Sequence, residues 1–138
     1  MKIMFEKFFP DEYLGSTYKI PFEKLYEQGY RGVIFDIDNT LVPHGAPADE
    51  RAKRLFQRLR EIGFESCLLS NNQKKRVEMF NQEIQTHYIY NALKPARKNY
   101  LHAMEIMGTD QTNTLFVGDQ LFTDAVSYTH LRAHETRG

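Results

Sequence analysis

Apolar residues form two patterns along this chain: short runs in which most residues are apolar, and longer stretches in which apolar residues recur every three or four positions. The runs at 32–37 (GVIFDI), 64–69 (FESCLL) and 114–118 (TLFVG) have the length and residue types of single strands. Such runs are typical of strands buried on both faces of a parallel sheet. A shorter apolar stretch at 88–90 (YIY) indicates one more brief strand.

The stretches between these runs have helical spacing, with apolar residues on one face and polar residues between them. We predict helices at 21–29, 48–62, 73–84 and about 96–107, and glycines at positions 29, 63 and 108 end three of them. Strands that alternate with helices predict an α/β fold, a doubly wound parallel sheet with right-handed crossovers.

Composition is that of an ordinary globular protein, with 41% hydrophobic and 26% charged residues among 138. This length predicts a single domain over residues 1–138. Lys plus Arg and Asp plus Glu both number 18, so the net charge is zero and no overall field attracts nucleic acid. A single cysteine, Cys67, allows no internal disulfide. We therefore expect a cytoplasmic protein, and the overall charge indicates no nucleic-acid partner, which would have to bind a local patch.

Residues 1–20 form an N-terminal extension that is rich in apolar side chains. Charged residues and Pro10 interrupt it, so it lacks the unbroken apolar core of a secretory signal. The apolar residues could form a surface for a membrane or a partner, or could pack on the domain. We favour packing, and expect peripheral membrane contact only as the second possibility.

Polar side chains gather where the predicted strands end. In open α/β sheets the ligand binds at the carboxyl ends of the strands, so these side chains are candidates for a site. In chain order they are Asp36 and Asp38, Ser70 and Asn71, Lys94, and then Asp119 and Asp124.

This set of residues fits phosphoryl transfer, which needs a nucleophile, a cation and donors to the phosphate oxygens. Asp36 and Asp119 can supply hard oxygen ligands for Mg²⁺. Lys94 and the Ser70 hydroxyl can contact the phosphoryl oxygens. Asp38 can protonate the leaving oxygen and then deprotonate the attacking water, as acid and base do in covalent catalysis.

The aspartates also have structural interpretations. Asp36 and Asp38 could cap the next segment, but clustered carboxylates repel one another without a cation, which favours a functional pair. Asp119 and Asp124 could form a turn with a helix cap. We favour function at both pairs.

The remaining candidates have similar alternatives. Ser70 could be a helix N-cap, although a cap also directs backbone N–H groups at a phosphate. Lys94, before a proline, could be a solvated loop lysine. Asn71 either orients the phosphate or supports the turn, and both possibilities stay open. We expect Thr40 to support the site with its hydroxyl.

The candidate residues stand in the order of four known motifs. Residues 36–40 (DIDNT), after a strand, resemble the first motif of the haloacid dehalogenase superfamily, and Ser70 resembles the second. Lys94 resembles the third, and Gly118-Asp119 with Asp124 the fourth. The words DIDNTLV, LLSNN, ALKP and GDQLFTD resemble most of all the YqeG-type phosphatases of that superfamily.

This resemblance, over about residues 31–124, implies a Rossmann-like core and a mechanism. It implies an aspartyl-phosphate at Asp36 and acid/base work by Asp38. It also implies Mg²⁺ held by the Asp36 carboxylate, the Asp38 backbone carbonyl and Asp119, with Asp124 farther from the metal. An aspartate at position 38 favours rapid hydrolysis over a lasting phosphoenzyme.

The gaps between the motifs are short. Between Asp38 and Ser70 there is room for a turn, a helix and a strand, and between Ser70 and Lys94 for little more, so no cap domain fits. Capless members of the superfamily, subclass IIIA, leave the site open. We therefore expect a large or exposed phosphorylated substrate, such as a phosphoprotein, a nucleic-acid end or a phospholipid head group. Relatives of the YqeG type include phosphatidylglycerophosphate phosphatases, and a partner or self-association would supply any lid.

The last residues depart from the superfamily pattern, which calls for a helix and at least one more buried strand after Asp124. Residues 127–138 (SYTHLRAHETRG) contain no apolar run and resemble translated adapter sequence. We expect a truncated C-terminus and a sheet without its last strand or strands. The leading hypothesis is a Mg²⁺-dependent phosphomonoester hydrolase, and the alternative is a non-catalytic binding or scaffold module, inactive through truncation.

Overall fold

A computed structural model of the chain describes residues 17–37, 40–43, 45–91, 96–118 and 121–124, with the side chains of Ala96 and residues 121–124 left out. The elements along the chain are α2 (Phe22–Glu27), β1 (Gly32–Asp36), α3 (Glu50–Ile62), β2 (Glu65–Leu69), α4 (Lys74–Ile84), β3 (His87–Ile89), α5 (Ala96–Met107), β4 (Thr114–Gly118) and β5 (Leu121–Asp124). Each strand and helix that the hydrophobic pattern predicts is present, with ends shifted by one or two residues.

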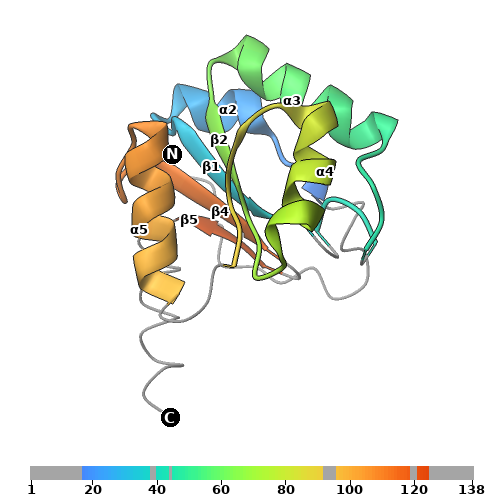
Figure 1. Cartoon of the computed structure of the whole chain (residues 1–138). Helices are drawn as coiled ribbons and strands as arrows, with labels where there is room; N and C mark the ends of the chain where they lie inside the picture. The colour runs from blue at the N-terminus through green and yellow to red at the C-terminus, as the bar shows by residue number, and fades with distance from the viewer. Residues whose placement is uncertain (1–16, 38–39, 44, 92–95, 119–120, 125–138) are drawn as a thin grey trace.

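The strands form one five-stranded sheet in the order β3-β2-β1-β4-β5 (Figure 1). Strand β1 pairs in parallel with β2 on one side and β4 on the other, and β2 pairs in parallel with β3. Four strands are therefore parallel, and helices flank them. This is the predicted α/β, Rossmann-like arrangement.

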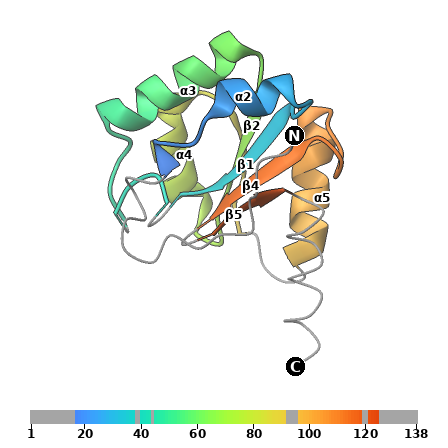
Figure 2. The ribbon, with the colours of Figure 1, turned by 180° about the vertical axis from the view of Figure 1, so that it is seen from behind.

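Alternating side chains of the central strand β1 enter two separate cores. Val33 and Phe35 pack with residues of α2, α3 and α4, whereas Ile34 packs with α5. Figures 1 and 2 show these helices on the two faces of the sheet. All three side chains are at most 1% exposed, and each contributes about 1.5–3 kcal/mol through burial. Residues 32–37 are mostly apolar because helices cover both faces of β1.

Helix α3 begins and ends at residues suited to those positions. The Asp49 side chain accepts a 2.8 Å hydrogen bond from the Ala52 amide and so caps the first turn. Gly63 ends the helix with φ +120, in the left-handed region. A Cβ at Gly63 would also lie 2.8 Å from the Tyr26 hydroxyl oxygen, so both the backbone and the space require glycine.

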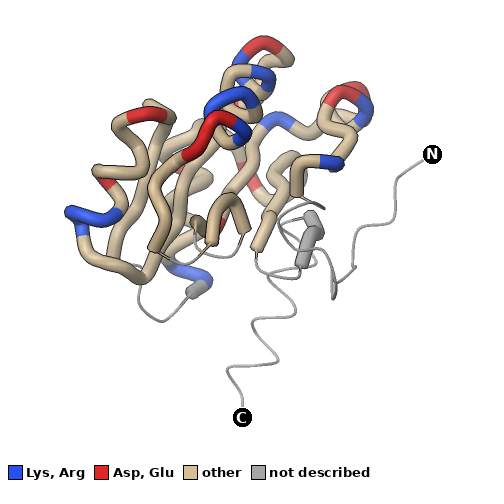
Figure 3. Tube along the Cα trace, turned by 90° about the vertical axis from the view of Figure 1, so that its right-hand side faces the viewer, with Lys and Arg blue, Asp and Glu red and all other residues tan. Residues whose placement is uncertain are grey.

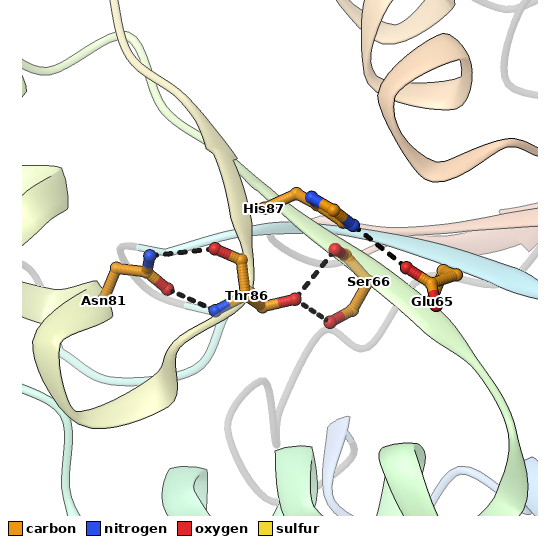
Figure 4. A network of polar contacts seen from close by, with 5 residues as sticks. All are labelled: Glu65, Ser66, Asn81, Thr86 and His87. Carbon is orange, nitrogen blue, oxygen red and sulfur yellow. Dashed lines mark hydrogen bonds and ion pairs between the residues drawn. The ribbon is translucent and has the colours of Figure 1, made fainter.

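A polar network fixes the turn from α4 into β3 (Figure 4). The Asn81 amide donates to the Thr86 carbonyl at 2.8 Å and accepts from the Thr86 N–H at 2.9 Å. The Thr86 hydroxyl lies 2.9 Å from the Ser66 carbonyl and 2.6 Å from the Ser66 hydroxyl. Glu65 and His87 pair beside it at 2.9 Å. These contacts hold the three-residue strand β3 against β2.

Strand β5 was not predicted from the sequence. It pairs antiparallel to β4, with Gly118 opposite Leu121 and Leu115 opposite Asp124. Only residues 119 and 120 separate the two strands, a connection short enough for a hairpin. The hydrophobic pattern predicts no strand here, because the apolar stretch Leu121-Phe122 is short and lies between the polar residues of the fourth motif. Residues 125–138 lie outside the described residues, so the expected truncation stays a prediction.

The start of the described chain packs on the domain. Thr17 and Ile20 are buried, and Tyr18 packs at the edge of the larger core. Residues 1–16 lie outside the described part, so the proposed contact with a membrane is not tested. Within that part, none of the helices has the length and apolar character needed to cross a bilayer. Charges of both signs are interspersed along the trace (Figure 3).

Candidate active site

The strand register brings two of the candidate residues, Asp36 and Ser70, to one edge of the sheet. Asp36 ends β1 level with Leu69 of β2, and Ser70 is the next residue. On the other side of β1, strand β4 ends at Gly118. The chain runs from β1 outward to β2 and β3 and then returns across to β4, so the order of strands reverses between β1 and β4. Ligands of open α/β sheets bind at such a reversal, and Asp36 stands there.

Gly118 lets the end of β4 approach Asp36 closely. A Cβ atom at Gly118 would lie 3.1 Å from Asp36 Oδ2 and 2.5 Å from Cε2 of the Phe116 ring. Glycine is needed here for space, because any side chain would overlap the ring. The bare backbone leaves the half-buried Asp36 carboxylate room beside the strand end.

The segment after β1 folds back on itself. The Ile37 carbonyl accepts from the amides of Thr40, Leu41 and Val42 at 3.4, 3.0 and 3.5 Å. All four side chains are at most 1% exposed. The Thr40 hydroxyl is buried and has no hydrogen-bond partner among the described residues. A buried hydroxyl costs free energy when it stays unpaired, so Thr40 is a donor suited to a site group.

Ser70 is buried in a local turn. Its amide donates to the Ile89 carbonyl at 3.1 Å, and its Oγ accepts from the Asn72 amide at 3.0 Å. Helix α4 begins only at Lys74, with Gln73 as the capping position, so Ser70 is not the helix cap. The Ser70 hydroxyl thus acts as an acceptor in this turn. It donates no hydrogen bond to another residue in the described part of the chain.

The remaining predicted residues divide into two groups. Asn71, next to Ser70, is exposed at this edge, which leaves both of its predicted roles open. Asp38, Lys94 and Asp119 lie outside the described residues. In the chain, Asp38 follows Asp36 by two positions, and Asp119 directly follows Gly118.

The structure does not bring Asp124 to this edge. Because β5 runs antiparallel to β4, the Asp124 backbone pairs with Leu115, three residues back from Gly118. Three residues of a strand span about 10 Å. The side chain of Asp124 is not described, so the role near the metal that the fourth motif implies for it stays a prediction.

One of the three candidate metal ligands, Asp36, lies in the described part of the chain, and its chemistry suits a hard divalent cation. Asp36 offers carboxylate oxygens at the sheet edge, and Gly118 leaves space beside them. Oxygen ligands, one or two of them carboxylates, are what Mg²⁺ usually takes from a protein. No cluster of three His, Cys, Asp or Glu residues occurs in the described ranges, which exclude Asp38 and Asp119. The magnesium site therefore stays a prediction.

The one cysteine lies away from this chemistry. Cys67 is buried under α5, and burial raises the pKa of its thiol to about 12. A thiol with so high a pKa is protonated at neutral pH and is a poor nucleophile. This agrees with a packing role for Cys67.

A search of curated proteins shows the family. The chain is 37% identical over 125 residues to "Probable phosphatase YqeG" of Bacillus subtilis (strain 168), an alignment that covers 89% of this chain and 73% of that protein. The chain belongs to the YqeG family of haloacid dehalogenase-type phosphatases. No protein-family model matches the sequence. The sequence motifs had indicated the same family.

A solved structure supports the fold independently. A hypothetical protein from Xanthomonas campestris superposes with a TM-score of 0.55 at 18% identity, over 70% of this chain and 59% of that one. The chain thus spans less than two thirds of that protein, and the likeness concerns the fold alone.

Sequence reasoning missed one contact at the site. The Tyr18 hydroxyl donates to the Leu41 carbonyl at 2.7 Å, across 23 positions. No motif includes Tyr18, and no local pattern predicts so distant a contact.

Proposed function

We propose that this YqeG-family protein is a Mg²⁺-dependent phosphomonoester hydrolase in which Asp36 is the nucleophile. The observation that carries the proposal is the position of Asp36, at the reversal of strand order, with the bare backbone of Gly118 beside its carboxylate. Membership of a family whose curated relative is named a probable phosphatase supports the same activity.

The proposed reaction has two steps. In the first, an Asp36 carboxylate oxygen attacks phosphorus, the bond to the ester oxygen breaks, and Asp38 gives its proton to the departing alcohol. In the second, a water molecule gives one proton to Asp38 and attacks phosphorus, and the bond between phosphorus and the Asp36 oxygen breaks. Inorganic phosphate leaves, and both carboxyl groups return to their starting forms.

Ser70 and Lys94 are the proposed contacts for the phosphoryl oxygens. Ser70 directly follows Leu69, the residue of β2 that is level with Asp36, and this position supports the role. Lys94 would add a positive charge where negative charge develops. Asn71 is a further candidate donor, and the buried Thr40 hydroxyl would support the segment after β1.

The cation would be held by the Asp36 carboxylate, the Asp38 backbone carbonyl and Asp119. When bound, Mg²⁺ supplies positive charge that offsets the negative charge of the phosphoryl oxygens, so that an anionic nucleophile can approach phosphorus. The close approach of Gly118 to Asp36 supports this assignment, because Gly118 directly precedes Asp119 in the chain.

We propose a large or exposed substrate in the cytoplasm. Between β1 and β2 the described chain contains only one helix, α3, which supports a site without a cap. A phospholipid head group such as phosphatidylglycerophosphate, or a phosphoprotein, would fit an open site. A partner or a second copy of the chain would supply a lid if one is needed.

Hydrolysis of para-nitrophenyl phosphate tests the proposal. We expect turnover with Mg²⁺, none with EDTA, and none in Asp36→Asn, which keeps the shape of the side chain but removes the nucleophilic charge. Ser66→Ala, at the opposite end of β2, is a control that should keep turnover. A folded wild-type protein without turnover on this ester or on phosphorylated lipid and protein substrates would favour the scaffold alternative.

A further inference from the structure

One long-range hydrogen bond reaches the segment that follows the nucleophile. The Tyr18 hydroxyl donates to the Leu41 carbonyl oxygen at 2.7 Å. Leu41 is completely buried, so its carbonyl is away from bulk water. A buried carbonyl that loses its partner costs more than a typical hydrogen bond gains, which makes this contact strongly preferred.

The bonded carbonyl belongs to the folded-back segment after β1. The Leu41 amide donates to the Ile37 carbonyl at 3.0 Å, and Ile37 is the residue directly after Asp36. Tyr18 therefore connects through Leu41 to the residue next to the nucleophile. The loop closed by the Ile37–Leu41 bond contains Asp38 in sequence.

Tyr18 is itself held in place. Its neighbours Thr17 and Ile20 are buried, and its ring packs at the edge of the larger core. The Arg51 guanidinium, in the first turn of α3, lies 4.3 Å from the ring centroid. Burial, with the nearby Asp49 charge, raises the pKa of Tyr18, so its hydroxyl stays protonated as a donor. The phenol is thus a rigid support.

We propose that Tyr18 is a positioning residue for the phosphoryl transfer: its hydrogen bond to Leu41 fixes the loop that follows Asp36. The inference rests on the proposed function, because its consequence is the placement of Ile37 and so of the adjacent nucleophile, Asp36. Tyr18 does not touch substrate in this account. It acts through Leu41 and Ile37.

Removal of the hydroxyl alone is the direct perturbation. In Tyr18→Phe the ring keeps its packing and its stacking with the Arg51 guanidinium. The Leu41 carbonyl loses its donor, and the exposed Arg51 loses only its interaction with the hydroxyl. We expect kcat for para-nitrophenyl phosphate with Mg²⁺ to fall about five- to tenfold, or roughly 1–1.4 kcal/mol. We expect KM to stay within about twofold, because the phosphate contacts lie on other strands. A purely structural role would change the melting temperature but not kcat well below it.

Hydrogen exchange gives a readout that does not depend on activity. In Tyr18→Phe the amides of Leu41 and Val42 should exchange faster, because the loop they close has lost its outer support. The amides of β1, such as Phe35, should keep their protection. Faster exchange in both places would mean general destabilisation and would overturn the inference.

Tyr26→Phe is the matched control. Tyr26 is also partly buried, and the Arg31 guanidinium lies 3.7 Å from its ring centroid. Its hydroxyl forms no hydrogen bond with another of the described residues. We expect wild-type kcat and exchange in Tyr26→Phe. An equal loss in both variants, or a wild-type kcat in Tyr18→Phe, would overturn the inference.

The two proposals fail in different ways. If the wild type lacks hydrolysis that depends on Asp36, the proposed function is wrong and the catalytic role of Tyr18 falls with it. If the wild type is active and Tyr18→Phe has the same kcat, only the positioning role is wrong.

Discussion

A methyl group at position 118 tests the geometry of the site. In Gly118→Ala the new Cβ would lie 2.5 Å from Cε2 and 2.9 Å from Cζ of Phe116, and 3.1 Å from Asp36 Oδ2. The ring cannot move freely, because Phe116 is 3% exposed and packs in the core beneath α5. The variant must therefore displace both the ring and the carboxylate.

Two separate losses follow from this displacement. Overpacking a filled core costs about 1–3 kcal/mol, which should lower the free energy of unfolding in urea by that amount. The Asp36 carboxylate must shift by a few tenths of an ångström. Because a misplacement of about 1 Å costs on the order of 100-fold in rate, we expect kcat to fall roughly five- to tenfold.

A matched variant separates stability from activity. In Gly32→Ala, at the opposite end of β1, the new Cβ would lie 2.9 Å from the Thr109 hydroxyl oxygen. It should destabilise the fold but keep kcat at temperatures where the protein is folded. A Gly118→Ala protein with wild-type stability and wild-type kcat would refute the close approach of β4 to Asp36.

Two further predictions concern stability alone. Asn81→Ala removes both hydrogen bonds to the Thr86 backbone, so the free energy of unfolding in urea should fall by about 1–3 kcal/mol. Asn81→Asp keeps the acceptor and should lose less. Equal stability of wild type and Asn81→Ala would contradict the network. Arg58 binds Glu23 through two nitrogens, at 2.8 and 2.6 Å, and lowers the pKa of Glu23 to about 2. Since the folded pKa is depressed, this stabilisation is present above about pH 4.5 and is lost as the pH falls toward 2. The exposed pair contributes about 0.5–1 kcal/mol after screening. Glu23→Gln should therefore be less stable than wild type at pH 7 but equally stable near pH 2, and a constant difference would contradict the linkage.

The sequence predicted the parts of the fold that depend on local pattern. The run at 32–37 is apolar because β1 is covered on both faces, and Gly63 ends α3 because only glycine fits the left-handed backbone beside Tyr26. Such features leave a periodic or residue-specific signal in the sequence. The parallel sheet follows from the alternation of predicted strands and helices along the chain.

Contacts between distant segments left no such signal. Strand β5 depends on pairing with β4, and its few residues also suit a loop. The Tyr18–Leu41 bond joins positions far apart in the chain, and each residue alone is unremarkable in sequence. The same holds for the site. The motifs indicated Asp36 and Ser70, but only the strand register and the packing show that Gly118 lies beside Asp36.

Chemical trapping of the phosphoenzyme tests the central claim most directly. The wild type would be mixed with a radiolabelled phosphomonoester and Mg²⁺, quenched in acid within milliseconds, and digested for peptide mapping by mass spectrometry. The account predicts label on the peptide that contains Asp36, sensitive to hydroxylamine as an acyl phosphate is, and absent from Asp36→Asn. Turnover without label at any quench time, or label on another residue, would contradict Asp36 as the nucleophile.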